Sequence, residues 1–208
     1  MNKIGLTLIA ALLATTSMTA IADTSSMNGS VSGMGILEND YVKAGVNGTS
    51  GTFGSGGNTS PGLLFDSTGT GTFNTSYDYL TPGSPFDGWS IKIDGVNTTN
   101  NNASGSSWTD SDGLSDTTDG FTWQGTNSDY AGWQVEHNYS LGATSQFIDI
   151  ETNITAGSSA SDSTVYFGRF IDPDARAADG DSSSTDNVLG YSGIPDSNVA
   201  FSEALSSR

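Results

Sequence analysis

Short β-favouring runs separated by glycine, asparagine, aspartate and serine occur along most of this chain. No stretch of about ten or more residues has the pattern of a helix. In residues 147–154, isoleucine or threonine occupies every second position, and acidic or amide side chains follow Phe147 at the others. This alternation is typical of a strand with one buried face. Because parallel strands need long crossover connections, the sequence predicts an all-β fold, an antiparallel β-sandwich, of which the supersandwich is one form.

The turn-forming residues between these runs also predict where the strands lie and where the domain begins and ends. Residues 1–22 are set apart as a leader, residues 23–35 as a flexible start, and residues 36–208 as a single β-sandwich domain. We expect strands at residues 41–46, 62–65, 71–74, 77–80, 89–94, 120–124, 132–141, 147–154 and 165–171, with the last two paired as a hairpin through residues 155–163. The final apolar run, at residues 199–205, lies close to the C-terminus, so we expect a domain truncated there, in a protein that continues into further domains.

The first 22 residues have the pattern of a cleaved signal peptide. Lys3 precedes an apolar run at residues 4–14, and Ala20 and Ala22 supply small residues before Asp23. The apolar run is shorter than the roughly 20 residues that a membrane-spanning helix needs. We therefore expect an exported mature chain with no transmembrane segment, located in the extracellular space or on the outer cell surface, with the periplasm as an alternative.

Charge and composition limit the partners and the chemistry. The chain has 208 residues, 6 of them Lys or Arg and 23 Asp or Glu, for a net charge of −17. Such a charge repels nucleic acid and anionic lipid, which leaves cations, neutral glycans and other proteins as partners. The absence of cysteine excludes thiol catalysis, and a chain with one histidine is a poor candidate for zinc.

Two aspartate-rich segments suggest metal binding, because Ca²⁺ prefers hard oxygen ligands at close spacing. The first is a candidate calcium site made of Asp172, Asp174, Asp179, Asp181 and Asp186. The alternative is an acidic, solvated loop. The second, residues 110–113, imitates a calcium loop without its glutamate, so ordinary turn chemistry is the better interpretation.

Candidate catalytic and glycan-binding residues are few. His137 is the one histidine, and the chain lacks the G-x-S-x-G motif that would supply a serine nucleophile. Paired carboxylates for glycoside hydrolysis are available, but nothing singles out a pair. The aromatic side chains offer a glycan-stacking platform or, alternatively, core packing; they are Trp89, Trp108, Trp123 and Trp133, with Tyr77, Tyr79 and Tyr130 beside them.

Three segments, residues 63–66, 79–89 and 165–174, resemble the amino-terminal regions of large exported proteins of Gram-negative bacteria, of the surface or autotransporter type. The resemblance covers about residues 36–208 and implies no catalytic residue. The strand at residues 148–154 also resembles, in its pattern, the supersandwich β-domains that accompany carbohydrate-active enzymes. The repeated rung of a parallel β-helix passenger is not seen in this sequence.

The sequence contains no complete catalytic motif, which favours binding over catalysis. It predicts a non-enzymatic, exported extracytoplasmic module of a larger envelope or secreted protein, contributing adhesion or display, with a glycan or a surface protein as partner. Two alternatives stay open. One is a carbohydrate-binding β-sandwich domain, and the other is a fragment of a glycan-active hydrolase or lyase.

Overall fold

The computed structural model describes residues 25–28, 33–80, 87–103, 105–110, 112–158, 162–171, 186–189 and 202–205, with the backbone alone at 25–28, 77, 186–189 and 202–205. The strands are β1 (Ser25–Asn28), β2 (Met34–Glu38), β3 (Val42–Asn47), β4 (Leu63–Phe65), β5 (Asp87–Ile93), β6 (Val96–Asn101), β7 (Ser115–Asp116), β8 (Gly120–Thr126), β9 (Gln134–Ser140), β10 (Asp149–Thr155), β11 (Val165–Ile171), β12 (Asp186–Leu189) and β13 (Ser202–Leu205). In these parts of the chain the one helical element is a 3₁₀ helix, η1 (Thr75–Tyr77).

The strands form antiparallel sheets, which confirms the all-β prediction. One sheet has the order β1-β2-β3-β4, a second β10-β9-β8-β7 and a third β11-β5-β6, while β12 and β13 form a two-stranded sheet. Every strand pair is antiparallel. Two strands that the sequence analysis did not list, β1 and β2, pair with each other at the start of the first sheet.

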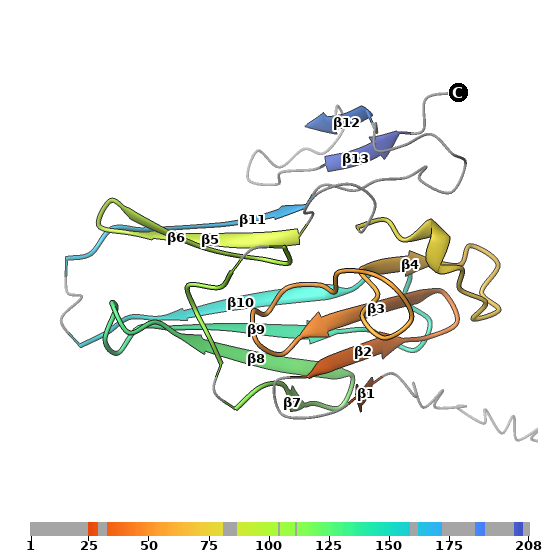
Figure 1. Ribbon diagram of the computed structural model, residues 1–208, viewed down its shortest axis with the longest axis horizontal. Coiled ribbons are helices and arrows are strands. Elements are labelled where there is room, and N and C mark those ends of the chain that lie inside the picture. The colour runs from red at the N-terminus through yellow and green to blue at the C-terminus, as the bar shows by residue number, and fades with distance from the viewer. Residues whose placement is uncertain are drawn as a thin grey trace, which may run out of the picture.

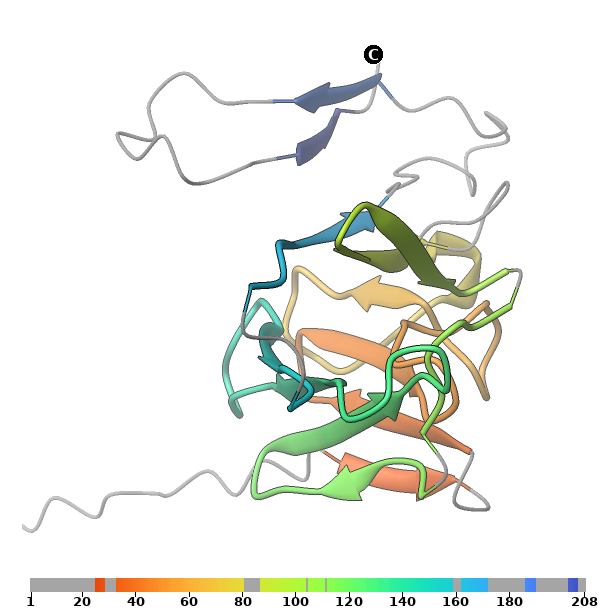
Figure 2. The same ribbon diagram turned by 90° about the vertical axis from the view of Figure 1, so that its left-hand side faces the viewer.

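The three larger sheets pack against one another (Figures 1 and 2). In Figure 1, β11, β5 and β6 lie above β10, β9 and β8. Trp89 of β5 and Trp123 of β8 meet between these layers, with ring centroids 5.6 Å apart. Figure 2 shows β4, β3 and β2 succeeding one another beneath the β11-β5-β6 sheet. Here Gly35 of β2 lies so close to Phe121 of β8 that an added Cβ would be 2.6 Å from its ring.

Side chains alternate along the strands between buried and more exposed positions, and the buried ones fill the space between the sheets. In β9, Val135, His137 and Tyr139 are buried while the residues between them are partly exposed. Among the described residues, the core cluster contains 17 buried hydrophobic residues, including all four tryptophans. Burying one such aromatic side chain removes roughly 150–250 Å² from water. In a chain with no disulfides, these aromatics account for much of the burial that stabilises the fold.

The pairing of the last long strand differs from the prediction. Residues 165–171 form β11 as expected, but β11 pairs with β5, and β10 pairs with β9. The reason lies at the turn between β5 and β6, where Asp94 accepts hydrogen bonds from the Ser163 hydroxyl (2.8 Å) and the Thr164 N–H (2.9 Å). Asp94 also donates its own N–H to the Thr164 carbonyl (3.0 Å). These contacts direct the chain into the β5 sheet.

The strands expected at residues 71–74 and 77–80 are wrong. The carboxylate of Asp66 accepts hydrogen bonds from the N–H groups of Thr68, Thr70 and Thr72, which holds this segment as a loop. Asn74 then caps the 3₁₀ helix η1 by accepting the Ser76 N–H at 3.0 Å. Local side-chain hydrogen bonds of this kind compete with strand pairing.

Candidate binding surfaces and the buried polar cluster

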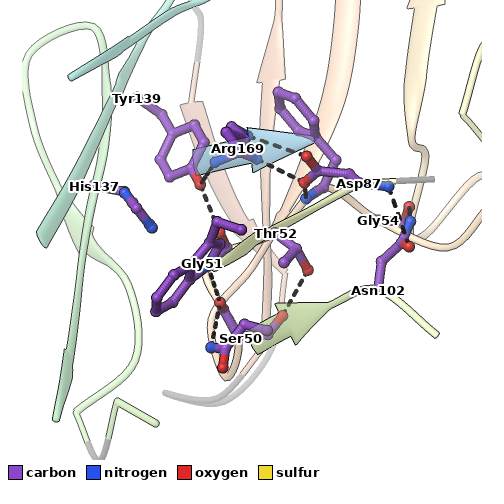
Figure 3. Close-up of polar contacts among 12 residues, drawn as sticks. Ser50, Gly51, Thr52, Gly54, Asp87, Asn102, His137, Tyr139 and Arg169 are labelled. Carbon is purple, nitrogen blue, oxygen red and sulfur yellow. Dashed lines mark hydrogen bonds and ion pairs between the residues drawn. The ribbon is translucent and has the colours of Figure 1, made fainter. Parts of the chain in front are cut away.

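A buried ion pair joins two strands of the β11-β5-β6 sheet (Figure 3). The guanidinium of Arg169 donates two hydrogen bonds to the carboxylate of Asp87, Nη2 to Oδ2 at 2.6 Å and Nε to Oδ1 at 3.1 Å. The Asp87 side chain is fully buried and that of Arg169 is 17% exposed. Asp87 Oδ2 also accepts the N–H of Phe53 at 2.6 Å. The ion pair therefore fixes the segment that follows β3 against β5.

The same arginine connects to the middle of the β7–β10 sheet. Its Nη1 donates to the Tyr139 hydroxyl at 3.0 Å, and that hydroxyl donates to the Gly51 carbonyl at 2.7 Å. Burial raises the pKa of Tyr139 to about 12. Burial opposes the charge of Arg169, but the carboxylate of Asp87 and the hydroxyl of Tyr139 together outweigh it, and the pKa of the guanidinium is raised. Arg169 is a charged structural link among three parts of the fold.

His137 lies in the aromatic interior. It is fully buried, stacks on Trp123 with centroids 5.3 Å apart and meets Trp89 edge-on at 5.0 Å. Its Nδ1 is 3.0 Å from the hydroxyl of Thr152, and its Nε2 has no hydrogen-bond partner among the described residues. Burial, and then the positive charge of Arg169, lower the pKa of His137 to about 3. In this arrangement His137 is a neutral packing residue shielded from solvent.

The burial of His137 predicts acid sensitivity. Its pKa is about 3 in the folded protein, against an ordinary value of 6.5, so between these values the unfolded chain binds a proton that the folded chain does not. The free energy of unfolding should therefore fall as the pH is lowered through that window. Urea unfolding at several pH values between about 4 and 7 measures the fall, which should be smaller in His137→Gln. Identical pH profiles for the two proteins would contradict this assignment.

The four tryptophans offered for glycan stacking all lie in the interior. Trp89, Trp108 and Trp123 are fully buried and Trp133 is 7% exposed. The indole of Trp108 stacks on Tyr130, with centroids 5.9 Å apart, and its Nε1 donates to the hydroxyl of Thr98 at 2.8 Å. Core packing, the alternative interpretation, accounts for their positions in this structure. An exposed glycan platform has to come from other aromatic residues.

The candidate calcium residues fall largely outside the described residues. Asp172, Asp174, Asp179 and Asp181 lie there, and Asp186 is described by its backbone alone, so the calcium site stays a prediction. In the second acidic segment, Asp110 Oδ1 accepts the N–H groups of Asp112 (2.8 Å) and Gly113 (3.0 Å), which is ordinary turn chemistry. In the described part of the chain, no three His, Cys, Asp or Glu side chains are grouped so that they could hold a metal ion.

The outer face of the β11-β5-β6 sheet carries exposed aromatic rings that the sequence analysis did not single out. Tyr166 is 65% exposed and Phe170 is 41% exposed. Gly168 lies between them on the same face, and an added Cβ there would meet nothing within 4 Å. The Phe170 ring lies over Gly88 of β5, where an added Cβ would touch its Cζ and Cε2 atoms. We call this surface the aromatic face.

Polar side chains continue the aromatic face across β5 and β6. The register places Tyr166 opposite Lys92 and Gly168 opposite Ser90, and Ser90 in turn lies opposite Thr99 of β6. The hydroxyls of Ser90 and Thr99 are 2.9 Å apart and hydrogen-bonded. Two exposed rings are thus separated by an open glycine, with hydroxyl and ammonium groups alongside.

A second surface feature is an apolar groove of about 550 Å³. It is lined by β3, β4, β10, the segment before β10 and the end of β11, and Gln146 and Tyr79 are the polar side chains among its lining residues. Phe147, at its rim, is 67% exposed, and Phe65 and Ile171 are also exposed. This volume lies within the range of about 300–1,000 Å³ that is usual for ligand sites.

Comparisons with known proteins add no assignment. No family model, no curated protein and no solved structure matches the chain. Among the described residues, no helix is long and apolar enough to cross a membrane. Function therefore has to be argued from the two exposed features, the aromatic face and the apolar groove.

Proposed function

We propose that this chain is a non-enzymatic, exported extracytoplasmic module of a larger envelope or secreted protein, and that it contributes to adhesion or display by holding a neutral glycan on its aromatic face. The observation that carries the proposal is the pair of exposed rings, Tyr166 and Phe170, on one face of β11 with open Gly168 between them. Aromatic rings offer sugars a flat apolar surface, and such exposed rings rarely serve the stability of the fold itself.

The spacing on β11 suits an extended sugar chain. Residues four apart on a strand are separated by roughly 13 Å, because each residue adds about 3.3 Å. Tyr166 and Phe170 therefore present two stacking positions along one line, and the gap above Gly168 leaves space for a sugar between them. Lys92 and the hydroxyls of Ser90 and Thr99 lie beside that line and can hydrogen-bond to sugar hydroxyls.

Charge favours a neutral glycan over an acidic one. The chain carries a net charge of −17, and a strongly acidic surface repels sulfated or uronic-acid polymers. The buried position of His137 among aromatic rings also favours binding over His-dependent catalysis.

The resemblance of residues 165–174 to exported surface proteins supports the extracytoplasmic setting, with residues 1–22 as the leader. The proposed architecture is a β-sandwich of the supersandwich type.

Glycan binding by the full chain tests the proposal. A panel of immobilised neutral glycans should contain at least one that the wild-type protein binds. Tyr166→Ala and Phe170→Ala should each weaken that binding roughly tenfold or more, which corresponds to about 1.4 kcal/mol of binding free energy. Affinity should be measured by calorimetry, with circular dichroism to show that each variant is folded.

Val96→Ala supplies the matched control. Val96 is an exposed hydrophobic residue of the same sheet, 59% exposed, but it pairs with the buried Ile93 and so lies on the face of the sheet opposite to the two rings. Its replacement should leave glycan affinity unchanged. Failure of the wild-type protein to bind any neutral glycan, or equal binding by folded Tyr166→Ala, would refute the proposal.

A further inference from the structure

The strand β10 is an open sheet edge. It pairs with β9 over all seven of its residues and stands at the end of the sheet order β10-β9-β8-β7. On the side away from β9, no strand of the described chain pairs with it. An edge of this kind presents a row of main-chain N–H and C=O groups that a further strand can bond.

β10 lacks the inward-pointing charge that protects the edge strand β11. β11 also ends its sheet, but it carries the charged Arg169 on its inward face, a device that discourages a further strand. The inward positions of β10 hold Ile150, Thr152 and Ile154, and this strand contains neither proline nor lysine. Of the two neighbouring edges, β10 is the one suited to accept another strand.

The apolar groove lies beside this edge. Ile148 and Ile150 line it from the β10 side, and Leu64 lines it from β4. Phe147 is 67% exposed at the rim, although a phenyl ring is normally covered in a folded protein. Main-chain bonding groups and an apolar groove therefore occur together, which is the combination used in β-strand addition.

We propose that the groove is filled by an extended segment of a partner polypeptide that adds to the sheet beside β10. Its main chain bonds to the open edge, and its alternate apolar side chains, about 6.7 Å apart, enter the groove. The outward positions of β10 carry Asp149 and Glu151, in a chain with a net charge of −17. The partner segment therefore alternates apolar residues with lysine or arginine, because acidic residues would be repelled.

A designed peptide tests the strand-addition proposal on the full chain. The probe is a fluorescein-labelled peptide of about nine residues that alternates lysine and valine. Fluorescence anisotropy should show saturable binding, and Phe147→Ala should weaken it roughly tenfold. Phe147→Ala should still fold, because the Phe147 side chain is mostly exposed and contributes little to the core. Tyr166→Ala, on the aromatic face, is the matched control and should bind the peptide like the wild type.

Two altered peptides separate strand addition from other modes of binding. Methylation of alternate peptide nitrogens removes the main-chain donors and should abolish binding, and glutamate in place of lysine should weaken it strongly. Binding of the methylated peptide with unchanged affinity would overturn the proposal, as would no binding of the lysine peptide at about 1 mM.

Other occupants of the groove would give different results. If a second copy of this chain fills it, sedimentation should show concentration-dependent dimers that Phe147→Ala dissociates, and the peptide should fail to bind. If a small apolar molecule fills it, dodecanol should bind saturably while the peptide does not. Either result would contradict the polypeptide partner. Since the glycan test uses the outer face of a different sheet, its outcome does not depend on this one.

Discussion

Replacing Asp87 by alanine is expected to lower the free energy of unfolding by about 3–5 kcal/mol, the loss typical of breaking a buried ion pair on one side. The change leaves the Arg169 guanidinium largely buried without its carboxylate, and it also removes the acceptor of the Phe53 N–H. Urea denaturation at neutral pH measures the loss through the midpoint and slope of the transition.

Two control variants isolate the effect of the buried charge. Glu38→Ala breaks the partly exposed pair with Lys43, in which the Glu38 and Lys43 side chains are 39% and 24% exposed, and should cost no more than about 1 kcal/mol. The double variant Asp87→Leu with Arg169→Met removes both charges and should be more stable than Asp87→Ala, because no unpaired charge is left inside. A loss below about 1 kcal/mol in Asp87→Ala would show that water reaches the arginine.

Trp89→Ala is expected to cost about 3–5 kcal/mol, since it leaves a large cavity at the centre of the core. Trp89 is fully buried and contacts Trp108, Trp123, His137 and Phe167 through its ring. Its Nε1 also donates to the Ser50 carbonyl at 3.1 Å. Thermal and urea unfolding should agree on the loss, and near-ultraviolet circular dichroism should weaken because the ring cluster is broken.

The matched control for Trp89→Ala is Tyr166→Ala, an aromatic truncation in the strand next to it. Tyr166 is 65% exposed, so its loss should change the free energy of unfolding by about 0.5 kcal/mol or less. Equal losses in the two variants would mean that the sheets do not pack around Trp89 as described.

Much of the β-structure could be predicted because alternation is a local property. The β10 segment shows it clearly: Ile150, Thr152 and Ile154 are partly buried, and the positions between them are exposed. The strand β6 was missed even though Asp94 and Gly95 form a favoured two-residue hairpin turn, with φ of 50° and 91°. The residues that follow them are mostly Asn and Thr, so the apolar pattern gave no sign of a strand.

Strand pairing and the candidate surfaces could not be predicted from local pattern. The choice of β5 over β10 as partner of β11 depends on contacts between Asp94 and residues far along the chain, Ser163 and Thr164. Alternation in β11 places Tyr166 and Phe170 on one face, but the other face carries Arg169, so polarity alone does not say which face is inward. The buried partner Asp87 decides it.

A nuclear magnetic resonance titration of the full chain with the best-bound neutral glycan tests the central claim most directly, namely that recognition occurs on the aromatic face and the tryptophan interior is structural. We predict amide shift changes at Gly168, Phe170 and Ser90, with the four tryptophan indole N–H signals unmoved. Shifts of the indole signals, with the β11 amides unchanged, would contradict the account and place the glycan among the tryptophans.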